Sequence, residues 1–112
     1  MPDSLRIADK DIRLDKEGYL EELADWTPEV ANILAMRENI SLTPAHWEVI
    51  DLLREFHAEH GLSPMMRVLV RKMKSRLGDD KGSSLYLMTL FPEYPALIAS
   101  KIAGLPRPTN CP

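Results

Sequence analysis

Residues 43–78 read TPAHWEVIDLLREFHAEHGLSPMMRVLVRKMKSRLG and contain two helix starts and two helix stops. In Thr43-Pro44 and Ser63-Pro64 a hydroxyl that can accept from a free helix N–H directly precedes proline, which fits the first helical position. Apolar residues then recur at helical spacing, and Gly61 and Gly78 follow as stops. The stretch therefore predicts two consecutive amphipathic helices joined by a short corner.

The inward faces of these two helices follow from their periodicity. The apolar residues expected to face the core are Trp47, Ile50, Leu53, Phe56, Met66, Leu69, Val70, Met73 and Leu77. Methionine in such a stripe usually fills gaps in a core, so we assign no function to it.

Similar punctuation marks the helices on either side of this stretch. Thr27-Pro28 opens a helix that runs to about Arg37. Ser83 or Ser84 caps a fourth helix that Pro92 ends, because proline cannot continue it. The dipeptide at 94–95 is Tyr-Pro and opens a fifth helix, which the glycine at 104 terminates.

The N-terminal residues have the period of strands. Residues 5–8 and 11–14 alternate apolar with polar around Asp9-Lys10, which is typical of a short hairpin. A two-stranded hairpin is marginal alone, so it must pack on helices. The predicted fold class is mainly α: a small orthogonal bundle of about five helices with an N-terminal β-hairpin and a flexible C-terminal arm.

Length and composition fit one cytoplasmic domain. The 112 residues are 45% apolar, enough for one core, and no apolar run approaches the roughly 20 residues of a membrane span. The charged N-terminus does not resemble a secretory signal.

Residues 1–63 carry six Lys and Arg against fourteen Asp and Glu, whereas residues 64–112 carry eight against three. An anionic partner would therefore prefer the second half, although attraction between the halves within the fold explains the asymmetry equally well.

Two possible functions on the second and third helices are weakly supported. His57 and His60 have a spacing that can hold a metal, but no further ligand is evident and we predict no metal or cofactor. Arg67, Arg71 and Lys74 form a basic stripe after a helix–glycine–helix corner, as in a DNA-binding helix-turn-helix. The chain is acidic overall, so direct nucleic-acid binding is the less favoured interpretation.

The lone cysteine is the stronger candidate. Cys111 follows Pro106 and Pro108, which favour an extended, semi-rigid spacer. We divide the chain into a body, residues 1–103, and a mobile arm, residues 104–112, which can reach at most about 30 Å. A thiol on such an arm can enter the active site of another protein, which suits a carrier better than a self-contained enzyme.

The segments KGSSLYLMTLFP and KIAGLPRPTNCP, together with DKEGYL, LTPAHWEVIDLLREF and SPMMRVLVRKM, resemble the TusE/DsrC family of small sulfur-carrier proteins. The resemblance spans nearly the whole chain, and its most specific element is AGLPRP before a penultimate cysteine. It implies a helical bundle with a small hairpin, and a sulfurtransferase of the relay type that carries a persulfide on Cys111.

The resemblance also implies partners. Family members accept sulfur from an upstream sulfurtransferase complex, TusBCD-like or DsrEFH-like, and pass it on. In the TusE branch the recipient is a tRNA thiouridylase that makes 2-thiouridine. In the DsrC branch, which serves dissimilatory sulfur metabolism, a second cysteine stands where this chain has Ser100. A serine cannot close a disulfide, so the single-cysteine branch is favoured.

Three further expectations concern the arm and its docking. Pro112 stands where relatives often have an aliphatic residue, and Asn110 where Gly or Lys is usual. The cations expected to dock an acidic partner, or tRNA held by the recipient enzyme, are Arg67, Arg71, Lys101 and Arg107, although ordinary surface charge explains them as well. The alternative functions are a single-cysteine DsrC-like role in dissimilatory sulfur metabolism and a non-enzymatic DNA-binding module.

Overall fold

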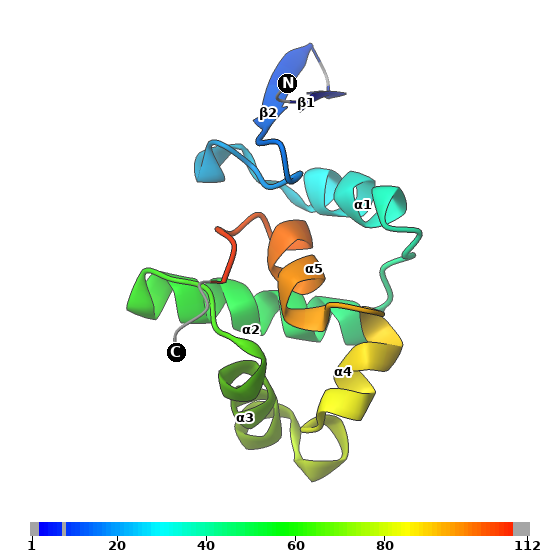
Figure 1. Ribbon diagram of the computed structural model, residues 1–112, viewed down its shortest axis with the longest axis vertical. Coiled ribbons are helices and arrows are strands. Elements are labelled where there is room, and N and C mark those ends of the chain that lie inside the picture. Colours follow the sequence, from blue (N-terminus) through cyan, green and yellow to red (C-terminus); the bar gives the residue numbers. More distant parts are fainter. Residues whose placement is uncertain (1–2, 8, 109–112) are drawn as a thin grey trace.

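The computed structural model describes residues 3–7 and 9–108 and shows a helical bundle with a hairpin at one end (Figure 1). The elements in chain order are β1 (Asp3–Ile7), β2 (Lys10–Leu14), η1 (Leu23–Asp25), α1 (Pro28–Arg37), α2 (Pro44–His60), α3 (Met66–Leu77), η2 (Asp79–Lys81), α4 (Ser84–Leu90) and α5 (Pro95–Ile102). The predicted mainly α bundle of five helices with an N-terminal hairpin is confirmed.

Two of the three hydroxyl–proline pairs start helices as predicted. The Thr27 hydroxyl accepts from the Val30 N–H at 3.2 Å at the start of α1. At the start of α2, His46 accepts the Thr43 N–H on Nδ1 at 3.0 Å, while its Nε2 lies 2.9 Å from the Leu90 carbonyl oxygen. The same imidazole therefore stabilises the start of α2 and ties it to the end of α4.

The third pair does not cap a helix, and that prediction was wrong. Helix α3 begins at Met66, two residues after Pro64, and Met65 is its extended N-cap. The Ser63 hydroxyl instead donates to the Pro106 carbonyl at 2.6 Å. This hydrogen bond therefore joins the α2–α3 connection to the C-terminal segment.

The hairpin forms, with its turn one residue earlier than predicted. The strands are antiparallel with Ile7 opposite Lys10, so β2 already begins at Lys10. Ile12 and Leu14 of β2 are buried, and Leu14 also forms a bridge with Leu20. These contacts attach the otherwise marginal hairpin to the helices.

Helix α5 is the centre of the bundle. It packs against α1, α2, α3 and α4 and lies between them in Figure 1. Of the predicted core residues, Ile50, Leu53, Leu69 and Met73 are fully buried. The others, Trp47, Phe56, Met66, Val70 and Leu77, are partly buried. The predicted boundaries of the last two helices are confirmed: Ser83 caps α4, and α5 runs from Pro95 to Ile102, two residues before Gly104.

Candidate functional site

The predicted thiol, Cys111, lies outside the described residues, as do Asn110 and Pro112. The structure does describe the chain as far as Pro108, three residues before the thiol. The site is therefore built from the segment 104–108, which we call the arm root, and from the surfaces beside it.

The arm root is packed on the body. Leu105 is buried and its N–H donates to the Ser100 carbonyl at 3.0 Å. The Pro106 carbonyl accepts the Ser63 hydroxyl, Arg107 pairs with Glu17, and Pro108 is buried. The predicted arm thus begins as a segment with its own contacts to the body.

Gly104 is where the chain leaves α5, and its conformation requires glycine. Its φ is +74°, and a Cβ built on it would lie 2.1 Å from Cδ1 of Trp26. The indole is fixed, because its Nε1–H donates to the Ile102 carbonyl at 2.9 Å. Only a residue without a side chain fits between this ring and the left-handed turn.

Arg54 completes the end of α5. Its guanidinium lies 3.8 Å from the centre of the Trp26 ring and donates to the Ala103 carbonyl at 2.7 Å. Burial lowers the pKa of Arg54, although Asp51 opposes this shift. The cation thus satisfies a carbonyl at the C-terminus of α5, where the helix dipole favours positive charge.

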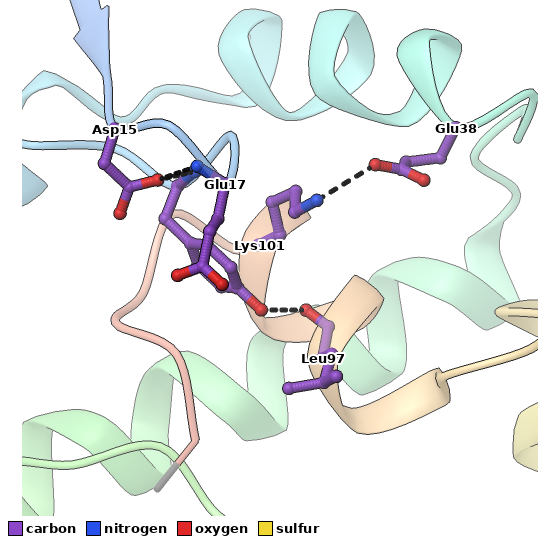
Figure 2. A network of polar contacts seen from close by, with 6 residues as sticks. Asp15, Glu17, Glu38, Leu97 and Lys101 are labelled. Carbon is purple, nitrogen blue, oxygen red and sulfur yellow. Dashed lines mark hydrogen bonds and ion pairs between the residues drawn. The ribbon is translucent and has the colours of Figure 1, made fainter. Parts of the chain in front are cut away.

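A polar network joins the turn after β2 to α5 (Figure 2). The Asp15 carboxylate accepts the N–H groups of Glu17 and Tyr19 at 2.9 and 3.0 Å, which fixes the turn. The Tyr19 hydroxyl donates to the Leu97 carbonyl at 3.1 Å. Burial raises the pKa of Tyr19 to about 12, since the effect of Arg107 in the opposite direction is smaller. The phenol therefore remains a hydrogen-bond donor at neutral pH.

The four predicted docking cations have different surroundings in the structure. Lys101 is only 17% exposed, pairs with Glu38 at 3.2 Å and lies over the ring of Tyr19. Arg107 is about half exposed, pairs with Glu17, and its positive charge acts to lower the pKa of Tyr19. The remaining two, Arg67 and Arg71, are exposed on α3 and show no ion pair among the described residues.

Sequence reasoning missed a groove beside the arm root. It has a volume of about 640 Å³ and is lined by Met65, Met66, Met88, Glu93, Tyr94, Pro95, Ala96, Leu97, Arg107 and Pro108. Its walls come from the start of α3, from α4 and α5, and from the arm root. Met66, which we assigned to the core, lines this groove; the adjacent pair of methionines before a basic helix was the available signal.

Ser100 lies under the arm root. Its side chain is completely buried, and its hydroxyl has no hydrogen-bond partner among the residues that the structure describes. Buried hydroxyls are normally paired, so this position suits a small, weakly polar side chain better than serine.

Among the residues that the structure describes, neither His57 nor His60 belongs to a group of three or more side chains that could hold a metal ion. The His60 ring packs against the Phe56 ring at a tilt of 44°, with ring centres 4.3 Å apart, and lies 3.5 Å from the Glu59 carboxylate. Within residues 3–7 and 9–108, no three His, Cys, Asp or Glu side chains are grouped as ligands. No helix in this part of the chain is long and apolar enough to cross a membrane.

Comparison with known proteins identifies close relatives. The family model described as "DsrC like protein" matches residues 6–112. "Sulfurtransferase TusE" of Escherichia coli (strain K12) is 48% identical over 102 residues, which cover 91% of this chain and 94% of that protein. "Sulfurtransferase TusE homolog" of Haemophilus influenzae is 48% identical over 107 residues, covering 96% and 98%.

Solved structures of DsrC proteins have a fold similar to that of this chain. The NMR structure of Allochromatium vinosum DsrC has a TM-score of 0.91 and 44% identity, with 99% of each chain covered. The crystal structure of the oxidized gamma-subunit of the dissimilatory sulfite reductase (DsrC) from Archaeoglobus fulgidus has a TM-score of 0.86 and 38% identity, covering 97% of this chain and 99% of that one.

Proposed function

This chain belongs to the DsrC-like family and is a sulfurtransferase of the relay type, and we propose that Cys111 is the residue on which it carries sulfur. The observation that carries the proposal is the extent of the family match. It runs through residue 112 and so includes the penultimate cysteine and the segment before it.

The proposed transfer is an exchange at sulfur. The Cys111 thiolate attacks the outer sulfur of a persulfide on a donor protein, the donor's S–S bond breaks, and the donor cysteine leaves as a thiolate. Cys111 now holds the persulfide. A thiolate of the acceptor then attacks the outer sulfur in the same way and regenerates the Cys111 thiolate. Neither step needs an external oxidant or reductant.

The arm root supports this role because it limits how far the thiol can lie from the body. Three peptide units separate Pro108 from Cys111, so their Cα atoms are at most about 11 Å apart. A partner that reaches Cys111 must therefore come close to the surface around Pro108. The division into a body and a mobile arm is retained as a proposal, with the first part of the arm packed against the body as described above.

We propose a donor complex of the TusBCD or DsrEFH type and, as acceptor, a tRNA thiouridylase in the cytoplasm. The 48% identity to a TusE sulfurtransferase and to a TusE homolog, over 91% and 96% of this chain, supports this assignment. Ser100 also supports it, because serine provides no thiol at the position where the DsrC branch has its second cysteine. Arg67, Arg71, Lys101 and Arg107 remain the proposed docking cations, and the first two are the most accessible.

Structural likeness favours one alternative. The solved structures of highest similarity described above are DsrC proteins, one of them a subunit of dissimilatory sulfite reductase. A single-cysteine carrier could pass sulfur to a dissimilatory enzyme through the same chemistry. That exchange needs only one thiol, so it does not require a cysteine at position 100.

Mass spectrometry after incubation with a persulfide donor tests the proposal. We expect the wild-type chain to gain one sulfur atom, and the Cys111→Ser variant to gain none. Transfer of this sulfur atom to tRNA by a purified thiouridylase then distinguishes tRNA thiolation from the dissimilatory alternative. No gain on the wild type, combined with salt-dependent DNA retention that survives Cys111→Ser, would replace the proposal with a DNA-binding function.

A further inference from the structure

The groove beside the arm root is lined almost entirely by apolar side chains. Three methionines, a tyrosine and a leucine contribute to its walls, together with the small residues at the start of α5. Glu93 and Arg107 are the two charged residues among its lining residues. A ligand bound there would gain affinity mainly from apolar burial.

Apolar side chains around this groove are unusually exposed. Met88 is 44% and Tyr94 is 65% exposed, and both line it. Leu85, one turn before Met88 on α4, is 75% exposed. A cluster of large exposed apolar residues marks a surface that binds another molecule.

The turn between α4 and α5 holds Tyr94 in this position. The Tyr94 N–H donates to the Pro92 carbonyl at 3.0 Å, and Glu93 has a φ of +75°. A non-glycine residue in this left-handed region is strained, because its Cβ crowds the following carbonyl oxygen. The chain thus adopts a strained turn where Tyr94 is presented to solvent, as is common at binding sites.

The position of the groove relative to the thiol indicates its occupant. Pro108 is both part of the groove wall and the last described residue before Cys111. Because the Cα atoms of Pro108 and Cys111 are at most about 11 Å apart, the protein that exchanges sulfur with the thiol must contact the same face. A partner with apolar side chains next to its reactive cysteine would fill the groove and meet the thiol together.

We propose that the groove is the docking site for an apolar segment of the protein that exchanges sulfur with Cys111. The inference rests on the sulfur-relay function and adds the body surface that the partner recognises. Methionine side chains adapt to differently shaped partners, which suits a carrier that must meet a donor and an acceptor in turn. The groove contains a single charge of each sign, so its own contribution to binding should depend little on ionic strength.

The test compares Met88→Glu with Met36→Glu. Met88 is exposed in the groove, whereas Met36 is 71% exposed on α1 and lines none of it, so each variant introduces the same charge at a surface methionine. Equal urea unfolding curves for the two variants would establish that both fold. Persulfide loading is measured with glutathione persulfide and with a purified TusBCD-type donor complex, and the affinity for that complex is measured by surface plasmon resonance.

We expect Met88→Glu to reduce both transfer from the protein donor and affinity for it at least tenfold, with loading by glutathione persulfide unchanged. Met36→Glu should behave like the wild type. Wild-type transfer and affinity in Met88→Glu would overturn the inference. Faster loading of Met88→Glu by glutathione persulfide would assign the groove to the chain's own C-terminal residues, and a wild-type dimer dissociated by Met88→Glu would assign it to a second copy; either result overturns it.

Failure of the proposed function gives a different result. If the wild type does not load from either donor, Cys111 is not a sulfur carrier under these conditions, and the affinity measurement still decides the groove. Tenfold weaker binding of Met88→Glu would then support docking without the proposed chemistry, whereas unchanged binding would reject both.

Discussion

Gly104→Ala should destabilise the protein by about 3–6 kcal/mol, far more than the same change at Gly61. Both glycines have nearly the same left-handed φ, +74° and +73°. The alanine Cβ at 104 would overlap the ring of Trp26, whereas nothing lies within 4 Å of a Cβ at 61. The pair therefore separates the cost of the backbone conformation from the cost of the overlap.

The magnitude follows from these two contributions. A left-handed alanine costs about 1–2 kcal/mol, and this is the whole effect expected at Gly61. At Gly104, relief of the overlap requires Trp26 to move, since the alternative is a shift of the backbone where α5 ends. Overpacking of a fixed site costs about 1–3 kcal/mol, and loss of the indole hydrogen bond to Ile102 adds about 1 kcal/mol.

Urea unfolding followed by tryptophan fluorescence measures both free energies of unfolding. The Trp26→Ala background supplies a double-mutant cycle, because removal of the ring should relieve most of the extra cost of Gly104→Ala. The Cβ of residue 26 remains 2.8 Å from the added Cβ, so the cost should stay somewhat above that of Gly61→Ala. Equal destabilisation at the two glycines in the wild-type background would refute the reasoning. It would mean that Trp26 does not constrain the point where the arm root begins.

Two further predictions concern residues around the arm root. Because the pKa of Tyr19 is about 12 in the folded protein against 10.0 when exposed, its contribution to stability is complete below pH 10 and is lost as the pH rises towards 12. Unfolding free energies should fall by roughly 2 kcal/mol more in the wild type than in Tyr19→Phe across this range, and parallel profiles would contradict the assignment. Ser100→Cys should fold normally, since the buried hydroxyl makes no hydrogen bond that the described residues show, and should allow a disulfide with Cys111 under mild oxidation. Intact mass spectrometry would then show the loss of two hydrogens, which Cys111→Ser should abolish; a free thiol at both positions after oxidation would show that the arm does not bring Cys111 to position 100.

Local rules were sufficient for most of the fold. Helix α1 has the threonine cap and proline that the dipeptide at 27–28 predicted, and α4 ends before Pro92 as expected. The failure at Ser63 has a long-range cause, because its hydroxyl bonds to Pro106, 43 residues away. A rule that considers only neighbouring residues cannot include such a competitor.

The site was less predictable than the fold for the same reason. Cys111 could be singled out by its place in the chain, but the groove combines residues from three helices and the arm root. Lys101 shows the same limit, because its ion pair with Glu38 and its position over the ring of Tyr19 involve residues that are distant in the sequence.

Anchoring of the arm root matters more for placement than for concentration. Counted from Gly104, seven peptide units would separate Cys111 from its anchor, whereas three separate it from Pro108. For a flexible tether, effective concentration falls as about the −3/2 power of length, so this shortening raises it roughly fourfold, or less than 1 kcal/mol. Contacts as specific as those of Ser63 and Trp26 are not needed for so small a gain. Their larger consequence is that Pro108 is fixed as a wall of the apolar groove. The Cα atom of Cys111 therefore cannot lie more than about 11 Å from the Cα atom of this wall residue, where we propose that a partner docks.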